Sequence, residues 1–136
     1  MTRYLAVTAR VLLGLVFLVT GLNGFLNFLP QPATPMPAGA VAFAGALVKT
    51  GYMMPLLMGT QLVAGALLLS NRFVPLALAL LAPVVVNIVA FHLFLARAGL
   101  PLAGLVLVLE AFLAWAYRGA YRTMLASRAA PGGRLP

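Results

Sequence analysis

The sequence predicts an all-α integral membrane protein: a four-helix bundle with a short interfacial or re-entrant helix between spans one and two. Two observations predict this class. First, 64% of the residues are hydrophobic and only 7% are charged, whereas soluble domains have about 45–50% and roughly 25%. Second, several apolar runs approach the roughly 20 residues that a helix needs to cross a hydrocarbon core.

The charge and the cysteine count exclude several function classes. A net charge of +8 would suggest nucleic acid in a soluble protein, but the basic residues here lie at the ends of apolar runs, where membrane topology places them. We therefore expect the lipid bilayer, and no nucleic acid, as a partner. The chain has no cysteine and one histidine, which excludes iron–sulfur ligation and covalent haem attachment by its own residues. No metal site is expected.

Four spans are predicted in a single membrane domain of residues 1–136. Their ranges are about 4–29, 52–70, 73–95 and 102–121. The proline-rich stretch QPATPMP (31–37) breaks the chain after the first span, and Ala38–Val48 is then too short to cross at about 1.5 Å per residue. The tail 123–136 is predicted to be flexible. A cleaved signal peptide is the alternative for the first span, although its apolar core exceeds the usual length of about 7–15 residues.

Lysine and arginine predict the orientation. With four spans both termini lie on one side, which holds seven of the basic residues, against two (Lys49 and Arg97) on the other. The positive-inside rule then makes both termini cytoplasmic. This predicts a multi-pass protein of the bacterial inner membrane.

The candidate site residues are the polar side chains inside the spans. Counted inward from the predicted outer ends at about 1.5 Å per residue, one such residue from each span falls in a common layer of the outer half. The candidates for a ligand or proton site are Glu110, Asn87, Gln61, Asn23, His92 and Asn27.

Glu110 and His92 each have two interpretations. Glu110 is the only acid in the chain, and an acid at a helix centre costs about 2.5–3.5 kcal/mol on insertion scales and normally faces the bundle interior. It is either a neutral carboxyl that hydrogen-bonds Asn87 or Gln61 and so holds the helices together, or a proton or ligand site. His92 is either an interfacial hydrogen-bonding anchor or a ligand. The glycines of spans one and two, by contrast, are interpreted as close-packing positions.

Long stretches of the chain resemble the DoxX family of small bacterial membrane proteins. The similar segments are RVLLGLVFLVTGLNGFLNFL, PMPAGAVAFAGALVKTGYMMPLL, LEAFLAWAYRGAYRTML and, most specifically, PVVVNIVAFHLFL, and together they cover roughly residues 10–125. The family often has a basic residue near the position of Asn23–Gly24 and an acid near Gln61, which this chain lacks. The resemblance implies a four-helix inner-membrane protein associated with quinone, thiosulfate or oxidative-stress chemistry, without defined catalytic residues.

Three alternatives for the function follow. The first is a membrane subunit of a redox or oxidative-stress system that binds a quinone or another lipophilic ligand; the chain has no catalytic motif or electron carrier, so such a role needs a redox partner protein or a bound cofactor. The second is a small proton-coupled transporter that uses a buried glutamate, and a non-catalytic structural or assembly protein is the third alternative. A homo-oligomer is compatible with each of them.

Overall fold

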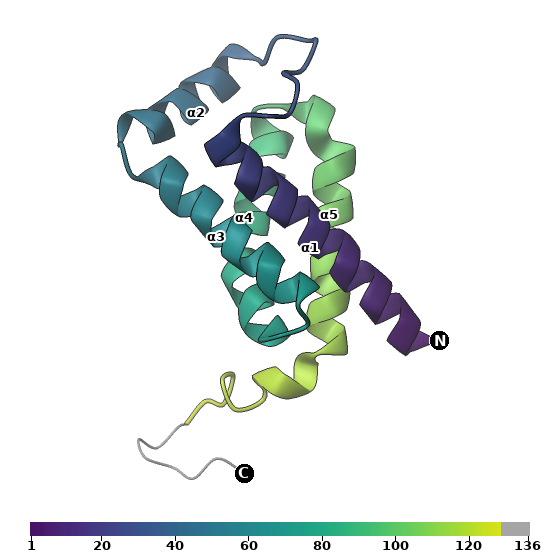
Figure 1. Cartoon of the computed structure of the whole chain (residues 1–136). Coiled ribbons are helices and arrows are strands. Elements are labelled where there is room, and N and C mark those ends of the chain that lie inside the picture. The colour runs from purple at the N-terminus through teal and green to yellow at the C-terminus, as the bar shows by residue number, and fades with distance from the viewer. Residues whose placement is uncertain (129–136) are drawn as a thin grey trace.

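The chain folds into five α-helices and two short 3₁₀ turns in the computed structural model, which describes residues 1–128 (Figure 1). The elements are α1 (Thr2–Leu26), α2 (Ala38–Lys49), α3 (Met53–Leu69), α4 (Val74–Phe94), η1 (Arg97–Gly99), α5 (Leu100–Ala116) and η2 (Arg118–Tyr121). Within residues 1–128 there is no strand. The prediction of an all-α chain is confirmed for this part of the sequence.

Three helical stretches are long and apolar enough to cross a membrane. They are α1, α4 and the continuous run Arg97–Ala116 formed by η1 and α5. The 17 residues of α3 reach only about 25 Å, which is less than the hydrocarbon thickness of about 30 Å. Helix α2 joins α3 at a bend of 93°, and together the pair passes the same test of length and composition. The apolar helices therefore suggest a membrane protein with three crossings, or four if the bent pair is one of them.

Two predicted spans run past the ends of the α-helices. Helix α1 ends at Leu26, three residues before the predicted end, because Asn27 takes the left-handed conformation with φ 53°. The Asn23 side-chain oxygen then accepts a hydrogen bond from the Leu29 backbone N–H at 2.7 Å. At the other end, α5 stops at Ala116, and the remaining part of the predicted fourth span forms η2. The predicted tail lies mostly in residues 129–136, outside the described residues.

Helices α1 and α3 form the most extensive helix pair, and glycine makes their contact possible. A β-carbon at Gly65 would lie 2.5 Å from the Leu18 backbone nitrogen, and one at Gly21 would lie 2.6 Å from the Leu62 backbone nitrogen. Small residues let two backbones approach in this way. The interpretation as close-packing positions is confirmed for these glycines and for Gly14 and Gly24, but it is wrong for Gly59, where a β-carbon would meet nothing within 4 Å.

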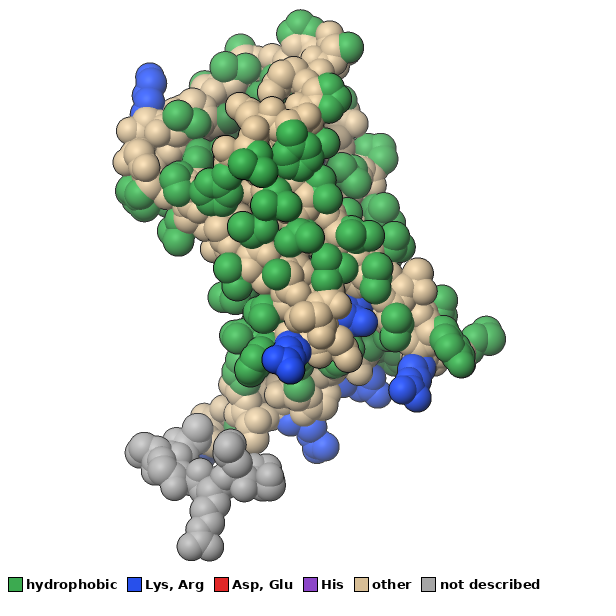
Figure 2. All heavy atoms as spheres, viewed as in Figure 1, with side chains coloured by type: hydrophobic (Ala, Val, Ile, Leu, Met, Phe, Trp, Pro, Cys, Tyr) green, Lys and Arg blue, Asp and Glu red, His purple; other side chains and the backbone are tan. Residues whose placement is uncertain are grey.

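The long helices enclose one hydrophobic core. Its fully buried large side chains are Phe17, Leu13, Leu68, Leu78, Leu81, Leu113 and Val85. The chain start, the α3–α4 turn and η2 lie at one end of the molecule, here called the η2 end, and α2 lies at the opposite end, here called the α2 end (Figure 1). On the face in Figure 2, basic side chains gather at the η2 end, with another at the end of α2, whose last residue is Lys49.

Candidate functional site

Three cavities lie at the α2 end, and His92 lines all of them. The first, of about 320 Å³, opens between the loop 32–37 and η1. The second, of about 180 Å³, lies among α1, α3, α4 and α5, and the third, of about 220 Å³, lies among α2, α3 and α4. The second and third share Gln61, Ile88 and His92 in their walls. We call these two adjoining cavities the chamber.

The walls of the chamber are mostly apolar. Four polar side chains interrupt them: Thr20, Gln61, Asn87 and His92. The apolar and small residues around them are Val16, Phe17, Phe43, Ala44, Leu47, Leu57, Met58, Ile88, Phe91, Leu102, Ala103 and Val106. An apolar pocket with a few convergent polar groups is the usual form of a small-molecule site.

His92 is held by the turn that follows its own helix. Its Nδ1 lies 3.0 Å from the carbonyl oxygen of Ala96, and because a carbonyl only accepts, the neutral ring carries its proton on Nδ1 and leaves Nε2 as an acceptor. Gly99 approaches the ring so closely that a β-carbon there would overlap it. The Phe91 ring meets the imidazole edge to face, with centroids 5.2 Å apart. His92 thus makes a hydrogen bond to the turn after its helix, and it also lines both cavities of the chamber.

Gln61 is the most buried polar residue of the chamber, with 5% of its surface exposed. Its Oε1 lies 2.9 Å from the Thr20 hydroxyl, which also lies 2.8 Å from the carbonyl oxygen of Val16. When the hydroxyl donates to Gln61, the amide N–H₂ group of Gln61 has no hydrogen-bond acceptor among residues 1–128. This arrangement leaves two donor protons for a ligand that enters the chamber.

The structure brings only part of the predicted layer of polar residues to the chamber. Asn23 and Asn27 end α1, as described above, and line neither cavity of the chamber. Asn87 is exposed on α4, although it reaches the edge of the third cavity. Of the six candidates, the structure brings Gln61, Asn87 and His92 to one cavity and leaves the other three outside it. Asn23 lies nearer to the end of its helix than the predicted span implied, because α1 ends earlier than predicted.

Glu110 lies toward the η2 end of α5, ten residues after Leu100 and six before Ala116. It is 6% exposed, and its Oε2 is buried without a hydrogen-bond partner in the described chain. Neither Gln61 nor Asn87 bonds to it, so the expected interhelical hydrogen bond is not formed. Burial raises the pKa of Tyr121, and the charge of Glu110 raises it further; the Tyr121 hydroxyl donates to the Pro75 carbonyl at 2.9 Å.

Arg10 is a buried polar residue that is not among the six candidates predicted from the sequence. It is only 7% exposed, and its guanidinium donates to the backbone carbonyls of Leu68 and Leu69 at the end of α3. A cation is favoured there because the carbonyl end of a helix carries partial negative charge. The signal in the sequence was the apolar segment YLAVTA before Arg10 (residues 4–9), which continues the helix to Thr2 and places Arg10 two turns inside it.

These groups offer hydrogen bonds to a ligand. Within residues 1–128, no group of three His, Asp or Glu side chains could hold a metal ion. The chamber offers an amide, a hydroxyl and an imidazole nitrogen in an apolar surrounding, which suits a lipophilic molecule with a carbonyl or hydroxyl head. Comparisons with protein-family models, with curated proteins and with solved structures found no match for this chain.

Proposed function

We propose that this chain is a DoxX-like protein of the bacterial inner membrane that binds a quinone, or a lipophilic ligand with a quinone-like head, in the chamber. The observation that carries the proposal is the meeting of Gln61 and His92 at the shared wall of the two cavities. A ring carbonyl can accept from the Gln61 amide N–H₂ group, and a ring hydroxyl can donate to the free Nε2 of His92. Each cavity alone is smaller than the usual pocket of about 300–1,000 Å³, so the chamber suits the head while the tail stays among the lipids.

The proposal includes a membrane topology. Helices α1, α3, α4 and α5 each cross and form a four-helix bundle, and α2 lies at the outer surface, where the bend of 93° turns it away from α3. The seven-to-two distribution of basic residues supports cytoplasmic termini. The chamber then opens in the outer half of the bilayer, within reach of a ligand that diffuses in the membrane.

The proposed role is that of a membrane subunit. The chain has no cysteine, and its described residues contain no cluster of metal ligands, so we propose that electrons reach a bound quinone from a redox partner protein. A homo-oligomer is compatible with this role. A quinone supplies two-electron redox chemistry when it is bound, and the residues of this chain bind and orient its head.

The test is binding of a short-tailed quinone, decylubiquinone, to the purified protein in nanodiscs. We expect saturable binding at one site per chain, and a loss of about tenfold in affinity for His92→Phe, because one hydrogen bond to a buried polar group is worth about 1–1.5 kcal/mol. Thr60→Val is the matched control. Thr60 is adjacent to Gln61 but bonds to the carbonyl of its own helix at Leu56, and it lines neither cavity of the chamber.

Two results would contradict the proposal. One is an absence of saturable binding in the native chain, together with no quinone in the lipid extract of the purified protein. The other is an equal loss for His92→Phe and Thr60→Val, which would place the quinone outside the chamber. Retained folding of each variant is checked by thermal unfolding in the same nanodiscs.

A proton-coupled transporter is the second candidate, because Glu110 is buried with an oxygen that has no partner in the described chain. In that mechanism the carboxyl must gain and lose a proton, so Glu110→Gln keeps the fold and abolishes transport. Uptake of a lipophilic cation into proteoliposomes with an imposed pH gradient tests it. Proton-driven uptake that depends on Glu110 would favour this candidate over the quinone site.

A further inference from the structure

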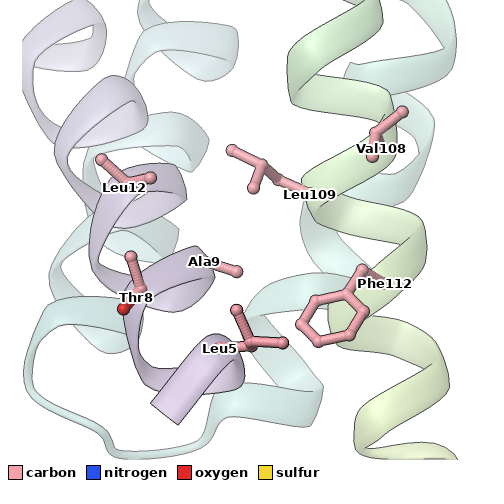
Figure 3. A pocket seen from close by; sticks show the side chains of 7 residues that line it. All are labelled: Leu5, Thr8, Ala9, Leu12, Val108, Leu109 and Phe112. Atoms are coloured by element: carbon pink, nitrogen blue, oxygen red, sulfur yellow. The ribbon is translucent and has the colours of Figure 1, made fainter. Parts of the chain in front are cut away.

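An apolar crevice separates α1 from α5 toward the η2 end. It has a volume of about 320 Å³, and its walls are Leu5, Thr8, Ala9 and Leu12 of α1 and Val108, Leu109 and Phe112 of α5. In Figure 3 the side chains of Leu5 and Ala9 lie across the gap from Leu109 and Phe112. Several of these residues remain open to the surroundings of the chain; Leu5 is 56% and Val108 is 64% exposed. The shape and the polarity suit a hydrocarbon chain.

A cationic pocket lies at the η2 end of α5. Its walls are Ala116, Arg118, Gly119 and Arg122. Ala116 follows Phe112 by four residues, which places them on one face of α5, about 6 Å apart along its axis. Ala116 of the cationic pocket therefore lies on the face of α5 that lines the crevice.

The Arg118 guanidinium is fixed in place and still has donors to spare. Its Nη1 donates to the Trp115 carbonyl at 2.9 Å, and its central carbon lies 4.6 Å from the centroid of the Trp115 ring, a cation–π contact. Trp115 in turn stacks on Phe112 of the crevice, with centroids 6.3 Å apart. Because an arginine side chain carries five N–H donors, most of those on Arg118 remain for a ligand.

We propose that this face of the protein binds an anionic phospholipid, with the phosphate on Arg118 and Arg122 and one acyl chain in the crevice. The combination of two guanidinium groups and an adjoining hydrocarbon-sized crevice matches a lipid that has both parts. A tryptophan beside the head group fits the membrane interface, where aromatic rings are enriched. The site is separate from the chamber and does not depend on the quinone proposal.

The charge of the chain argues against a second copy as the occupant. The only acidic side chain in the sequence is Glu110, and it is buried in the core. A second copy would therefore bring no side-chain carboxylate to the two arginines. An anionic lipid brings a phosphate to them, and basic residues at a membrane surface attract such lipids.

The experiment uses the only tryptophan of the chain as its reporter. Trp115 lies between the crevice and the cationic pocket, so a lipid with brominated acyl chains should quench its fluorescence when it occupies the site. The protein is reconstituted in phosphatidylcholine vesicles that contain increasing fractions of brominated phosphatidylglycerol, and in a parallel series with brominated phosphatidylcholine. We expect quenching by the anionic lipid to saturate at a low mole fraction, and quenching by the neutral lipid to rise only in proportion to its fraction.

Variants assign the two parts of the site. Arg118→Gln and Arg122→Gln together should weaken phosphatidylglycerol binding by about fivefold for each arginine removed. The control is Arg72→Gln with Arg128→Gln, which removes the same charge from residues that line neither the crevice nor the cationic pocket. Val108→Phe narrows the crevice and should also weaken binding, whereas Leu107→Phe, outside the crevice, should not.

Three results would overturn the proposal. Equal quenching by the two lipids would show that no anionic lipid is selected. An equal loss of phosphatidylglycerol affinity in the two double variants would show that the lipid responds to the net charge of the chain and not to Arg118 and Arg122. A dimer that forms without phosphatidylglycerol and is broken by Val108→Phe would make the crevice an interface between copies of the chain.

Discussion

The two ends of the long helices bury polar side chains in different ways. At the chamber, Gln61 is 5% exposed, bonds to Thr20 and faces open volume. Toward the η2 end, Glu110 and Arg10 are buried to a similar degree, yet neither lines a wall of the chamber, and each has a polar atom without a partner in the described chain. Similar burial thus accompanies a cavity-facing amide in one region and packed ionisable side chains in the other.

This difference separates binding from structure. A neutral amide or imidazole beside a cavity can exchange its hydrogen bonds with a ligand at little cost. A polar or charged side chain in a close-packed core has no space beside it for a ligand. Its replacement changes the stability of the fold instead. We therefore expect the chamber residues to control ligand affinity, and the packed residues to control the free energy of unfolding.

The largest effect on stability should come from the contact between α1 and α3, because these helices contribute to both regions. Gly65→Ala places a β-carbon against the backbone of α1 at Leu18, so the helices must separate, at a cost of about 3 kcal/mol. Gly59→Ala on the same helix is the control, because its β-carbon meets nothing. Thermal unfolding in detergent measures both, and equal loss in the two variants would mean that α1 and α3 do not meet as described.

Removal of Arg10 should cost somewhat less. Arg10→Ala deletes the bonds to the Leu68 and Leu69 carbonyls, and hydrogen bonds that involve a charged group are worth about 1.5–3 kcal/mol. Arg3→Ala, which changes an exposed arginine of the same helix, should alter stability by less than about 0.5 kcal/mol. A lower quinone affinity in Arg10→Ala at unchanged stability would contradict the account, because it would show that a packed residue controls ligand binding.

Replacement of Glu110 by an apolar residue should stabilise the protein modestly. Glu110→Leu removes a buried carboxyl whose Oε2 has no partner in residues 1–128, and such an orphaned group costs about 1–3 kcal/mol. We expect the unfolding temperature to rise. A marked decrease in the unfolding temperature would contradict this expectation and would show that the Glu110 carboxyl has a stabilising partner.

The smallest effect is expected at Asn87. It is exposed on α4, so Asn87→Leu should change the free energy of unfolding by less than about 0.5 kcal/mol. Because Asn87 reaches the edge of the third cavity, a small change in quinone affinity is compatible with the account. A loss as large as that of His92→Phe would move the centre of the site toward α2.

Composition and run length were sufficient to predict the helices, because period and apolarity are local properties of a sequence. The short helix after the proline-rich loop was predicted from its length, and four of the five glycines that were interpreted as close-packing positions do make close contacts. The early end of α1 was missed because it depends on the left-handed conformation of Asn27, which an apolar run does not reveal.

The site could be predicted only in part. Gln61 and His92 stood out as polar residues in apolar runs, and both line the chamber. Which polar residues meet depends on the rotation and the relative height of four helices, and Asn23 lies nearer to the end of its helix than the predicted span implied. Arg10 was missed because the basic residues were used only as topological signals, although Arg10 lies inside the predicted first span and is buried in α1.

The most direct test compares one residue from each region in a single binding measurement. Decylubiquinone affinity is determined in nanodiscs for the native chain, Gln61→Leu and Glu110→Gln, two changes at side chains of nearly equal burial. The account predicts a loss of about tenfold for Gln61→Leu, which removes the amide donor from the chamber, and an unchanged affinity for Glu110→Gln. Unchanged binding in Gln61→Leu with a loss in Glu110→Gln would contradict the account and would place the ligand in the packed region instead.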